Sequence, residues 1–433
     1  MGVLRDMKKV ILAGPIFSRS GYGEHVRCVY RALEKHPDKY DIYIKPTNWG
    51  QTSWSYNNKT EENEIIEHCI KKTQMYQGEY DVSLQVLIPN EWTNMAKVNI
   101  GVTAGIETNK ASAKWIYHCN FMDKVIVISK HSKESFEKPT YQTQDEHGNP
   151  TGVLKCTVPI DVIGYPVKEK LLKSTKDLGL DIETDFNFLT VAQAGPRKAL
   201  HETLIWFAEQ FKDDASVGLI VKSNKINNSV MDRKHMKQSI IEMLKPVKDR
   251  KCKIYLLHGN LMEEELHSLY SHDKIHAYIT TTRGEGYGLP IFEAAYSGMP
   301  VVAPAWSGHV DFLYMPVTNS KSKKVKKMPM FLKTRFKLAP VNSDAVWEDV
   351  IDADSLWCYS DEKSFKKNLK NMRESYQYNK KQALQLQDYL RKEFHEDVIH
   401  QKYHDSIEDV APDDRVDIEN WLQEIGNNME EYE

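Results

Sequence analysis

Two glutamates and a run of glycines lie close together in the second half of the chain, and their spacing could support chemistry on a ligand. The stretch from Thr280 to Gly298 reads TTTRGEGYGLPIFEAAYSG, with Glu285 and Glu293 separated by seven residues. Glycine amides approach a ligand closely because no side chain shields them. Carboxylates beside such amides suit a ligand that carries hydroxyl groups as well as phosphate, because carboxylates accept hydroxyl hydrogen bonds well. The stretch therefore predicts a nucleotide-sugar site.

The residues around this stretch predict the elements that would position it. The apolar run from Ile275 to Ile279 predicts a buried strand, Pro290 suits the first position of a helix, and Gly298 suits the residue after its end. The glycines of the turn between them are Gly284, Gly286 and Gly288. A helix N-terminus presents free N–H groups and a partial positive charge, so the turn suits an anion. A glycine-rich turn with two solvated acids is the simpler interpretation, and a glycine string alone supports no more.

The sequence of this stretch resembles the E-x7-E signature of the retaining glycosyltransferases of family 4. The match comprises Glu285, the following GYGLP, Glu293 and the later SGMPVV of residues 297–302, and weaker matches extend from about Val10 to about His404. The resemblance implies an α/β protein of GT-B architecture, in which two Rossmann-like domains with doubly wound parallel sheets face each other across a cleft. It also implies that Glu293 holds the ribose of a nucleoside-diphosphate sugar and that Glu285 holds the sugar.

Further donor-binding residues follow from the same resemblance. The diphosphate would lie against the backbone amides of Gly286, Tyr287, Gly288 and Leu289. Lys198 matches a lysine that the family shows at the start of a helix after a strand. Gln193 stands near the position of the family's arginine, and Arg197 would supply the missing charge. Cations here would stabilise the diphosphate as it leaves, although a solvated loop is the alternative.

Two sites in the first half of the chain complete the predicted cleft. A first strand, Lys8 to Ala13, precedes a loop with Gly21 and Gly23, which the resemblance places against the donor's diphosphate; turn residues without contact to a ligand are the alternative. Glu107 follows another predicted strand, where family members often carry a carboxylate or histidine beside the reacting carbon, so we assign it a catalytic role; a solvated loop acid is the alternative. For His118 a buried core histidine is the better interpretation.

Length and composition set limits on the class of protein. The chain has 433 residues, enough for two domains, and a formal net charge of −3, so no overall field attracts nucleic acid or anionic membrane. Its six cysteines are scattered, as in a reduced cytosolic protein. No apolar run reaches the length of a membrane span. We expect a cytoplasmic enzyme that needs no cofactor and no catalytic metal.

The pattern along the chain predicts three regions. Residues 1–170 form an acceptor-side domain, residues 171–392 a nucleotide-sugar domain with a basic insert at 318–340, and residues 393–433 a crossover helix back to the first domain with an acidic tail. Lys321 to Lys337 holds eight basic residues and no acidic one, which indicates either a solvated loop or a patch for a polyanionic acceptor. Asp352-Ala-Asp354 spells a metal-binding D-x-D motif, which we interpret as a coincidence.

The sequence motifs are compatible with several acceptors. Three segments resemble glycosyltransferases of tailed phages: GYGEHV, VTAGIET and PAWSGHVDFL. The resemblance implies a location in the host cytoplasm. It also implies a hydroxylated base in DNA as one acceptor. A glycan, a protein or a small molecule fits the motifs equally well. A sugar-nucleotide epimerase or a phosphorylase could share the fold. A nucleic-acid-binding module with a vestigial site is a further alternative.

Overall fold

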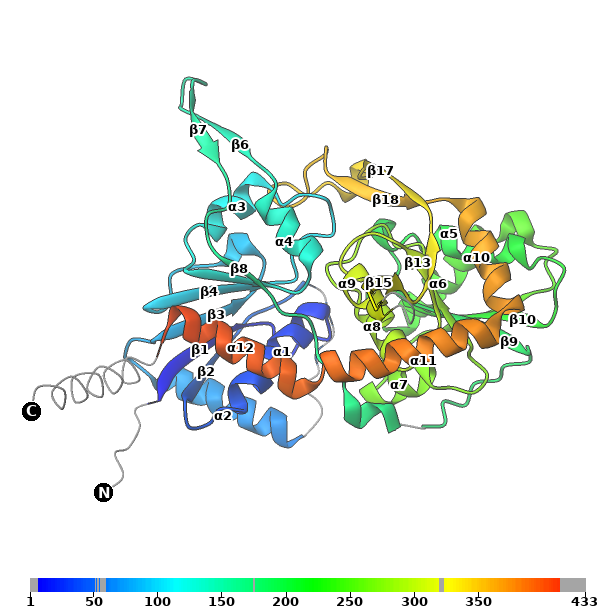
Figure 1. The fold of residues 1–433 in the computed structure, drawn as a ribbon, viewed down its shortest axis with the longest axis horizontal. Coiled ribbons are helices and arrows are strands. Elements are labelled where there is room, and N and C mark those ends of the chain that lie inside the picture. The colour runs from blue at the N-terminus through cyan, green and yellow to red at the C-terminus, as the bar shows by residue number, and fades with distance from the viewer. Residues whose placement is uncertain are drawn as a thin grey trace, which may run out of the picture.

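Two six-stranded sheets form the two domains of the protein (Figure 1). This computed structural model describes residues 7–50, 52, 54, 60–173, 176–318 and 323–412. The strands of the first sheet are, in spatial order, β2 (Tyr40–Pro46), β1 (Lys8–Gly14), β3 (Val82–Val86), β4 (Val98–Thr103), β5 (Lys124–Val127) and β8 (Ile160–Val162). Those of the second are β11 (Lys253–Leu257), β10 (Val217–Asn224), β9 (Phe186–Gln193), β12 (Ala277–Ile279), β13 (Val301–Pro304) and β16 (Leu332–Thr334). Each pair of neighbours within these two sheets runs parallel.

The sheets form because their strands are continuous apolar runs rather than alternating ones. Strands of this kind bury both faces, and helices then cover them on either side. Val10, Val82 and Phe188, one from each of three strands, are fully buried. The helices are α1 (Gly21–Glu34), α2 (Glu61–Met75), α3 (Ala113–Cys119), α4 (Lys130–Glu137), α5 (Leu200–Gln210), α6 (Val230–Met243), α7 (Glu263–Tyr270), α8 (Leu289–Tyr296), α9 (Val310–Leu313), α10 (Glu362–Glu374), α11 (Tyr376–Glu393) and α12 (Glu396–Val410). The predicted α/β class with two Rossmann-like domains is confirmed.

The order of strands in the second sheet determines where a ligand would bind. Its first strand in the chain, β9, lies between β10 and β12, so the connections reverse direction between β9 and β12. In open parallel sheets, ligands bind outside the carboxyl ends of the strands at such a reversal. The loops that leave β9 and β12 are those that carry Arg197, Lys198 and Glu285. The fold therefore brings together residues that lie far apart in the sequence.

The C-terminal helices connect the two domains. Figure 1 shows α11 running along the second domain and α12 continuing across the first. His25 Nε2 lies 3.0 Å from the hydroxyl of Tyr403, and the hydroxyl of Tyr40 lies 2.6 Å from Nδ1 of His404. The last described helix therefore packs against the first domain. The predicted acidic tail falls mostly within residues 413–433, outside the described part of the chain.

The basic segment differs from the loop-like insert that its composition indicated. An antiparallel ribbon, β14 (Tyr314–Thr318) with β15 (Val325–Pro329), begins it, while residues 319–322 lie outside the described chain. Leu332 to Thr334 then form β16, which pairs with β13 as the edge strand of the main sheet. The segment therefore belongs partly to the domain itself, because Leu332 and Thr334 alternate with Lys333, which stays exposed at the edge.

Two smaller hairpins extend from the domains. The strands β6 (Tyr141–Gln144) and β7 (Pro150–Leu154) form the first hairpin, which projects away from the first domain (Figure 1). The strands β17 (Phe336–Pro340) and β18 (Leu356–Ser360) form the second. We call residues 341–355, which connect β17 to β18, the strap.

The strap of the second domain is inserted into the core of the first. Val350 is 4% exposed and packs in one hydrophobic cluster with Trp115 and Phe136. The Oγ of Ser112 donates a hydrogen bond of 2.6 Å to the carbonyl of Asp349. These contacts tie the two domains together at a second point, far along the chain from the crossover helix.

The acidic motif of the strap has a structural role that the sequence did not indicate. Nζ of Lys110 lies 2.7 Å from a carboxylate oxygen of Asp354 and 3.6 Å from one of Asp352. Interpreting the motif as a coincidence therefore missed this ion pair across the domains. Among the residues that the structure describes, no group of His, Cys, Asp and Glu side chains is arranged to hold a metal ion.

We expect Val350→Asp to release the strap from the first domain, because burying an unpaired carboxylate costs several kcal/mol. Limited proteolysis with a glutamate-specific protease would measure this, since Glu348 lies in the strap. Cleavage after Glu348 should be about fivefold faster or more in the variant. Val346→Asp, an exposed position in the same segment, is the matched control and should leave the rate unchanged. Equal cleavage rates in Val350→Asp and the wild type would show that Val350 does not hold the strap.

Candidate active site

The turn between β12 and α8 lies directly against the first domain. A Cβ atom added to Gly284 would lie 2.0 Å from the carbonyl oxygen of Glu107, and one added to Gly286 would lie 2.5 Å from that of Ala104. The Oγ of Ser129 donates a hydrogen bond of 2.7 Å to the carbonyl of Gly286. A side chain at either glycine would push the domains apart. Their lack of a side chain is therefore required by packing, whether or not a ligand also uses their amides.

Glu285 is buried in this turn, and Lys198, Arg197 and Thr282 contact its carboxylate. Nζ of Lys198 lies 2.6 and 2.7 Å from its two oxygens. Thr282 Oγ1 donates to it at 2.7 Å, and Nη1 of Arg197 lies 3.2 Å away. The cations come from the loop after β9 and the carboxylate from the loop after β12, as the strand order requires. Three residues predicted for the site are thus in contact.

Glu107 joins this group from the first domain. Nη2 of Arg197 lies 3.2 Å from Glu107 Oε1, and Nη1 of Arg197 also donates to the carbonyl of Gly284 at 2.7 Å. Arg197 therefore bridges the two domains. Gln193, by contrast, is exposed and donates to the carbonyl of Lys225, away from this group of charges.

The electrostatics of the group follow from its burial. Desolvation alone would raise the pKa of Glu285, but Lys198 and Arg197 outweigh it and lower this pKa to about 2. Desolvation lowers the pKa of Lys198 despite the attraction of Glu285. For Arg197, the attraction of Glu107 and Glu285 outweighs desolvation and raises the pKa. Glu285 is therefore charged at neutral pH and holds two cationic side chains at the carboxyl ends of the strands.

Glu293 lies in a different environment, one turn into α8. It lines a narrow crevice of about 10 Å³ between the domains, together with Leu289 and, from the linking segment, Tyr165 and Lys168. The hydroxyl of Tyr270 donates to its carboxylate at 3.0 Å. Desolvation raises the pKa of Glu293 to about 7, with Lys168 opposing the shift. This carboxylate is thus poised between its neutral and charged forms near physiological pH.

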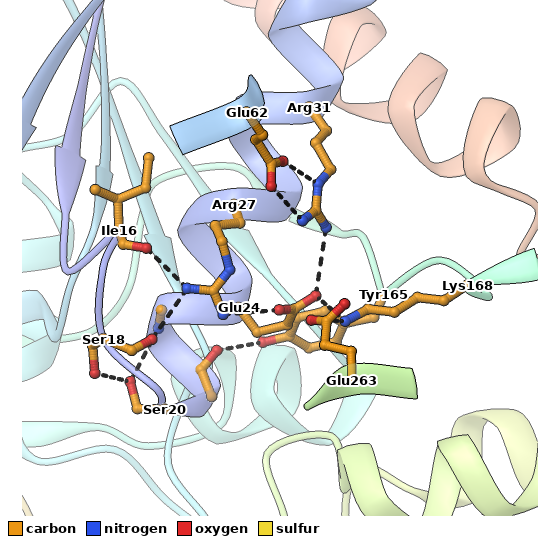
Figure 2. Close-up of polar contacts among 12 residues, drawn as sticks. Ile16, Ser18, Ser20, Glu24, Arg27, Arg31, Glu62, Tyr165, Lys168 and Glu263 are labelled. Carbon is orange, nitrogen blue, oxygen red and sulfur yellow. Dashed lines mark hydrogen bonds and ion pairs between the residues drawn. The ribbon is translucent and has the colours of Figure 1, made fainter. Parts of the chain in front are cut away.

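A network of charges borders the same crevice, and Figure 2 shows it. Lys168 Nζ lies 2.7 Å from Glu24 in α1 of the first domain and 2.9 Å from Glu263 in α7 of the second. Arg27 lies 3.0 Å from Glu24, and Arg31 lies 3.7 Å from it. The network holds the start of α1 in a fixed position relative to the crevice.

The two glycines predicted in the first loop differ in their surroundings. Both belong to the start of α1, where the Oγ of Ser20 accepts a hydrogen bond from the N–H of Gly23. A Cβ atom at Gly23 would lie 2.0 Å from the carbonyl oxygen of Ser18, so the tight turn requires glycine there. A Cβ atom at Gly21 would have no neighbour within 4 Å. Packing therefore accounts for the glycine at Gly23, whereas Gly21 borders open space. A contact of either glycine with the donor stays a prediction.

The side chains of Tyr287 and His118 lie in surroundings that their sequence motifs did not indicate. The side chain of Tyr287 is 3% exposed and packs against Tyr165, with ring centroids 5.1 Å apart, so only its backbone remains available to a donor. His118 is half-buried on α3, beside the exposed rings of Tyr117 and Phe121, and is not the core histidine that we expected. Both differences reflect which face of an element packs inward, which short motifs do not reveal.

Glu24, Lys168 and Glu263 are the site residues that the sequence analysis missed. They lie in three separate segments, and none belongs to a motif with a fixed spacing. Glu24 directly follows Gly23, so the glycine loop was the one signal that pointed near it. Lys168 follows Pro166, in the segment that links the domains, and only the fold shows that this segment passes the crevice.

Comparisons with known proteins identify the fold. No protein-family model matches the chain, and no curated protein matches its sequence. Among solved structures, sucrose-phosphate synthase from Thermosynechococcus elongatus matches with a TM-score of 0.60 at 11% identity, over 93% of this chain and 99% of that one. HepE from Anabaena, in complex with UDP and glucose, matches with a TM-score of 0.54 at 11% identity, over 93% and 100%.

A third match extends the same pattern. The catalytic domain of starch synthase IV from Arabidopsis thaliana, bound to ADP and acarbose, matches with a TM-score of 0.54 at 10% identity, over 94% of this chain and 100% of that one. These neighbours have the GT-B fold, so the predicted architecture is confirmed. Among the described residues, no helix is long and apolar enough to cross a membrane.

We predict that Glu293→Gln changes how stability depends on pH. The pKa of Glu293 is about 7 in the folded protein against an ordinary value of 4.5, so folding favours the protonated form. The wild type therefore gains stability from this group below about pH 4.5 and loses it as pH rises through about 7. Glutamine stays neutral, so the variant should become more stable than the wild type toward pH 8, by on the order of 1 to 3 kcal/mol.

Thermal unfolding at several values between about pH 5 and pH 8 would measure the difference in melting temperature between the wild type and Glu293→Gln at each pH. Glu64→Gln, on the exposed face of α2, is the control and should follow the wild type throughout. Parallel pH dependence of the wild type and Glu293→Gln would contradict the raised pKa.

Proposed function

We propose that this protein transfers a glycosyl unit from a nucleoside-diphosphate sugar to a hydroxyl group of an acceptor, with retention of the anomeric configuration. The observation that carries the proposal is the contact of Glu285 with Lys198 and Arg197 beside a glycine-rich turn, at the strand-order reversal of a GT-B fold. Membership of glycosyltransferase family 4 is part of the proposal and rests on the Glu285 and Glu293 signature.

The donor would lie between α8 and the loop after β9, and the domains would have to open to admit it, because the crevice beside Glu293 holds only about 10 Å³. Glu293 would accept hydrogen bonds from the ribose hydroxyls, which would compensate its charged form. The amides of residues 286–289 would face the diphosphate, and Lys198 with Arg197 would neutralise it. Glu285 would contact the sugar from its position beside both cations. The neighbour HepE, whose structure holds UDP and glucose, supports a ligand of this class.

The transfer needs no reactant other than the donor and the acceptor. The bond from the anomeric carbon to the phosphate oxygen breaks, and a bond from the acceptor oxygen to the same carbon forms on the same face. The leaving phosphate oxygen takes the proton of the acceptor hydroxyl, and the nucleoside diphosphate departs. Lys198 and Arg197 would stabilise the charge that develops on that oxygen, which is the largest contribution that a preorganised site usually makes. Glu107, which holds Arg197 from the first domain, would complete the site when the domains close.

A nucleic-acid acceptor is the second candidate, and the ribbon β14–β15 is the observation that favours it. Lys323, Lys324, Lys326 and Lys327 are all exposed there. Contacts of such lysines with phosphates weaken steeply as salt rises. Duplex DNA would be the acceptor in that case, reached through a base that leaves the helix.

We predict that a nucleotide-sugar raises the melting temperature of the protein, because a ligand that binds only the native state stabilises it. The probes are UDP-glucose, ADP-glucose, GDP-mannose and dTDP-glucose, each at saturating concentration. Glu293→Ala should lose most of the shift because the ribose contact is gone. Glu64→Ala, an exposed helical glutamate, should keep it. The absence of a shift with all four donors, or an unchanged shift in Glu293→Ala, would contradict the proposed donor site.

We predict further that Lys198→Met lowers kcat by about 100-fold, because it removes one cation from the leaving diphosphate. Release of nucleoside diphosphate from the donor that gives the largest thermal shift would measure this rate. Lys198→Arg keeps the charge and should lose much less. NMR of the product should show the anomeric configuration of the donor, and an inverted product would exclude the retaining mechanism.

A further inference from the structure

A cavity of about 420 Å³ opens between the two domains beside the candidate active site. Small-molecule sites commonly occupy about 300 to 1,000 Å³, so it can hold a ligand of that class. Its lining residues from the first domain are Asn109, Lys110, His131, Glu134, Lys138 and Pro139, and those from the second are Trp306 and Leu338. The cavity therefore depends on the closed arrangement of the domains.

The cavity adjoins the catalytic turn. The ring of Trp306 reaches Gly284, since a Cβ atom added there would lie 3.2 Å from it. Asn109 follows Glu107 closely in the chain and exchanges hydrogen bonds with the backbone of Leu356, at the start of β18. A molecule in the cavity would thus lie next to the group formed by Glu107, Arg197 and Glu285, where an acceptor hydroxyl must arrive.

Two rings form the side of the cavity that a ligand would meet. His131 and Trp306 face each other across the domains, with centroids 4.8 Å apart and planes at 72°. Nε2 of His131 is buried and has no hydrogen-bond partner among the residues that the structure describes. Desolvation lowers the pKa of His131 to about 4, so the imidazole is neutral at pH 7. A buried nitrogen without a partner is rare in native structures, and a ligand hydroxyl would satisfy it once a small shift of the surrounding side chains uncovers it.

The charges around the cavity are paired with one another, so the lining gives a strongly anionic ligand little advantage over a neutral one. Lys110 is bound by Asp354 at 2.7 Å and by Asp352 at 3.6 Å. Lys138 is paired with Glu134. Both lysines of the lining are therefore already neutralised, and a phosphate group would have to displace carboxylates to reach them. The lining suits a neutral ligand with an apolar ring face and several hydroxyl groups.

We propose that this cavity binds the acceptor, and that the acceptor is a neutral sugar ring stacked on Trp306 with one hydroxyl donating to Nε2 of His131. The inference rests on the glycosyl transfer proposed above and specifies the class of its second substrate. Aromatic side chains offer a large flat apolar face to such a ring. The charge pairing in the lining favours this ligand over a base of DNA, which arrives with phosphates on both sides.

Binding to the full-length protein in the presence of saturating UDP would test this assignment by saturation-transfer NMR. The probes are the methyl glycosides of glucose, galactose, mannose and N-acetylglucosamine, with 5-hydroxymethyldeoxycytidine and a short DNA duplex containing it. We expect at least one methyl glycoside to bind. Binding of the nucleoside or duplex alone, or of none of the probes, would overturn the proposal.

Variants locate the binding in the cavity. Trp306→Ala should weaken binding of the glycoside about tenfold or more. His131→Phe keeps the ring but lacks Nε2, so it should weaken binding about fivefold, and His131→Gln, which offers an oxygen, should recover part of the loss. Trp347→Ala, the same change at an exposed position of the strap, is the control and should bind as the wild type does. Unchanged affinity in both Trp306→Ala and His131→Phe would overturn the assignment.

The melting-temperature shift by a nucleotide-sugar, measured on the same variants, separates the two proposals. His131 does not belong to the proposed donor site, so His131→Phe should keep the donor shift of the wild type. A donor shift without glycoside binding would contradict the acceptor proposal and leave the transferase proposal standing. The absence of a donor shift in the wild type would contradict the transferase itself.

Discussion

The burial of the Glu285 carboxylate is the constraint on which the site depends. Removing a carboxylate from water costs several kcal/mol, and only paired cations with hydrogen bonds compensate it. Lys198, Arg197 and Thr282 provide this compensation together. Because the cations follow β9 and the carboxylate follows β12, the ion pairs fix the relative positions of two loops at the strand-order reversal. Loss of either cation would leave the buried charge of Glu285 only partly compensated. Lys198, Arg197 and Glu285 therefore act as a unit.

The same constraint extends to the domain interface. Arg197 contacts Glu107 as well as Glu285, so the buried group of charges reaches from one domain into the other. Gly284 and Gly286 allow the backbones of the two domains to meet beside it. The glycines thus meet two demands, a close approach of the domains and free amides for a ligand. The strap and α12 hold the closed arrangement from two other directions, since Val350 and Tyr403 are both buried against the first domain.

The sequence predicted most strands and the core of the site because both depend on local features. Buried parallel strands are continuous apolar runs, and the Glu285–Glu293 signature spans a single turn and helix. Contacts between distant segments have no comparable local pattern in the sequence. Lys168 has no motif around it, and its partners Glu24 and Glu263 lie far from it in the sequence. Charge runs were equally uninformative, because the Asp352-Ala-Asp354 motif and the basic segment gain their roles from Lys110 and from the sheet edge.

The two signature carboxylates have opposite electrostatic environments, and this difference separates their roles. Glu285 is in contact with two cations and has a pKa of about 2, so it is charged with or without a ligand. Glu293 receives one hydrogen bond from Tyr270 and has a pKa of about 7, so its charged form lacks compensation in the free protein. Hydroxyl groups that donate to Glu293 favour the charged form. Binding of a ligand with such hydroxyls is therefore coupled to loss of a proton, whereas Glu285 provides a fixed charge around which the cations are already arranged.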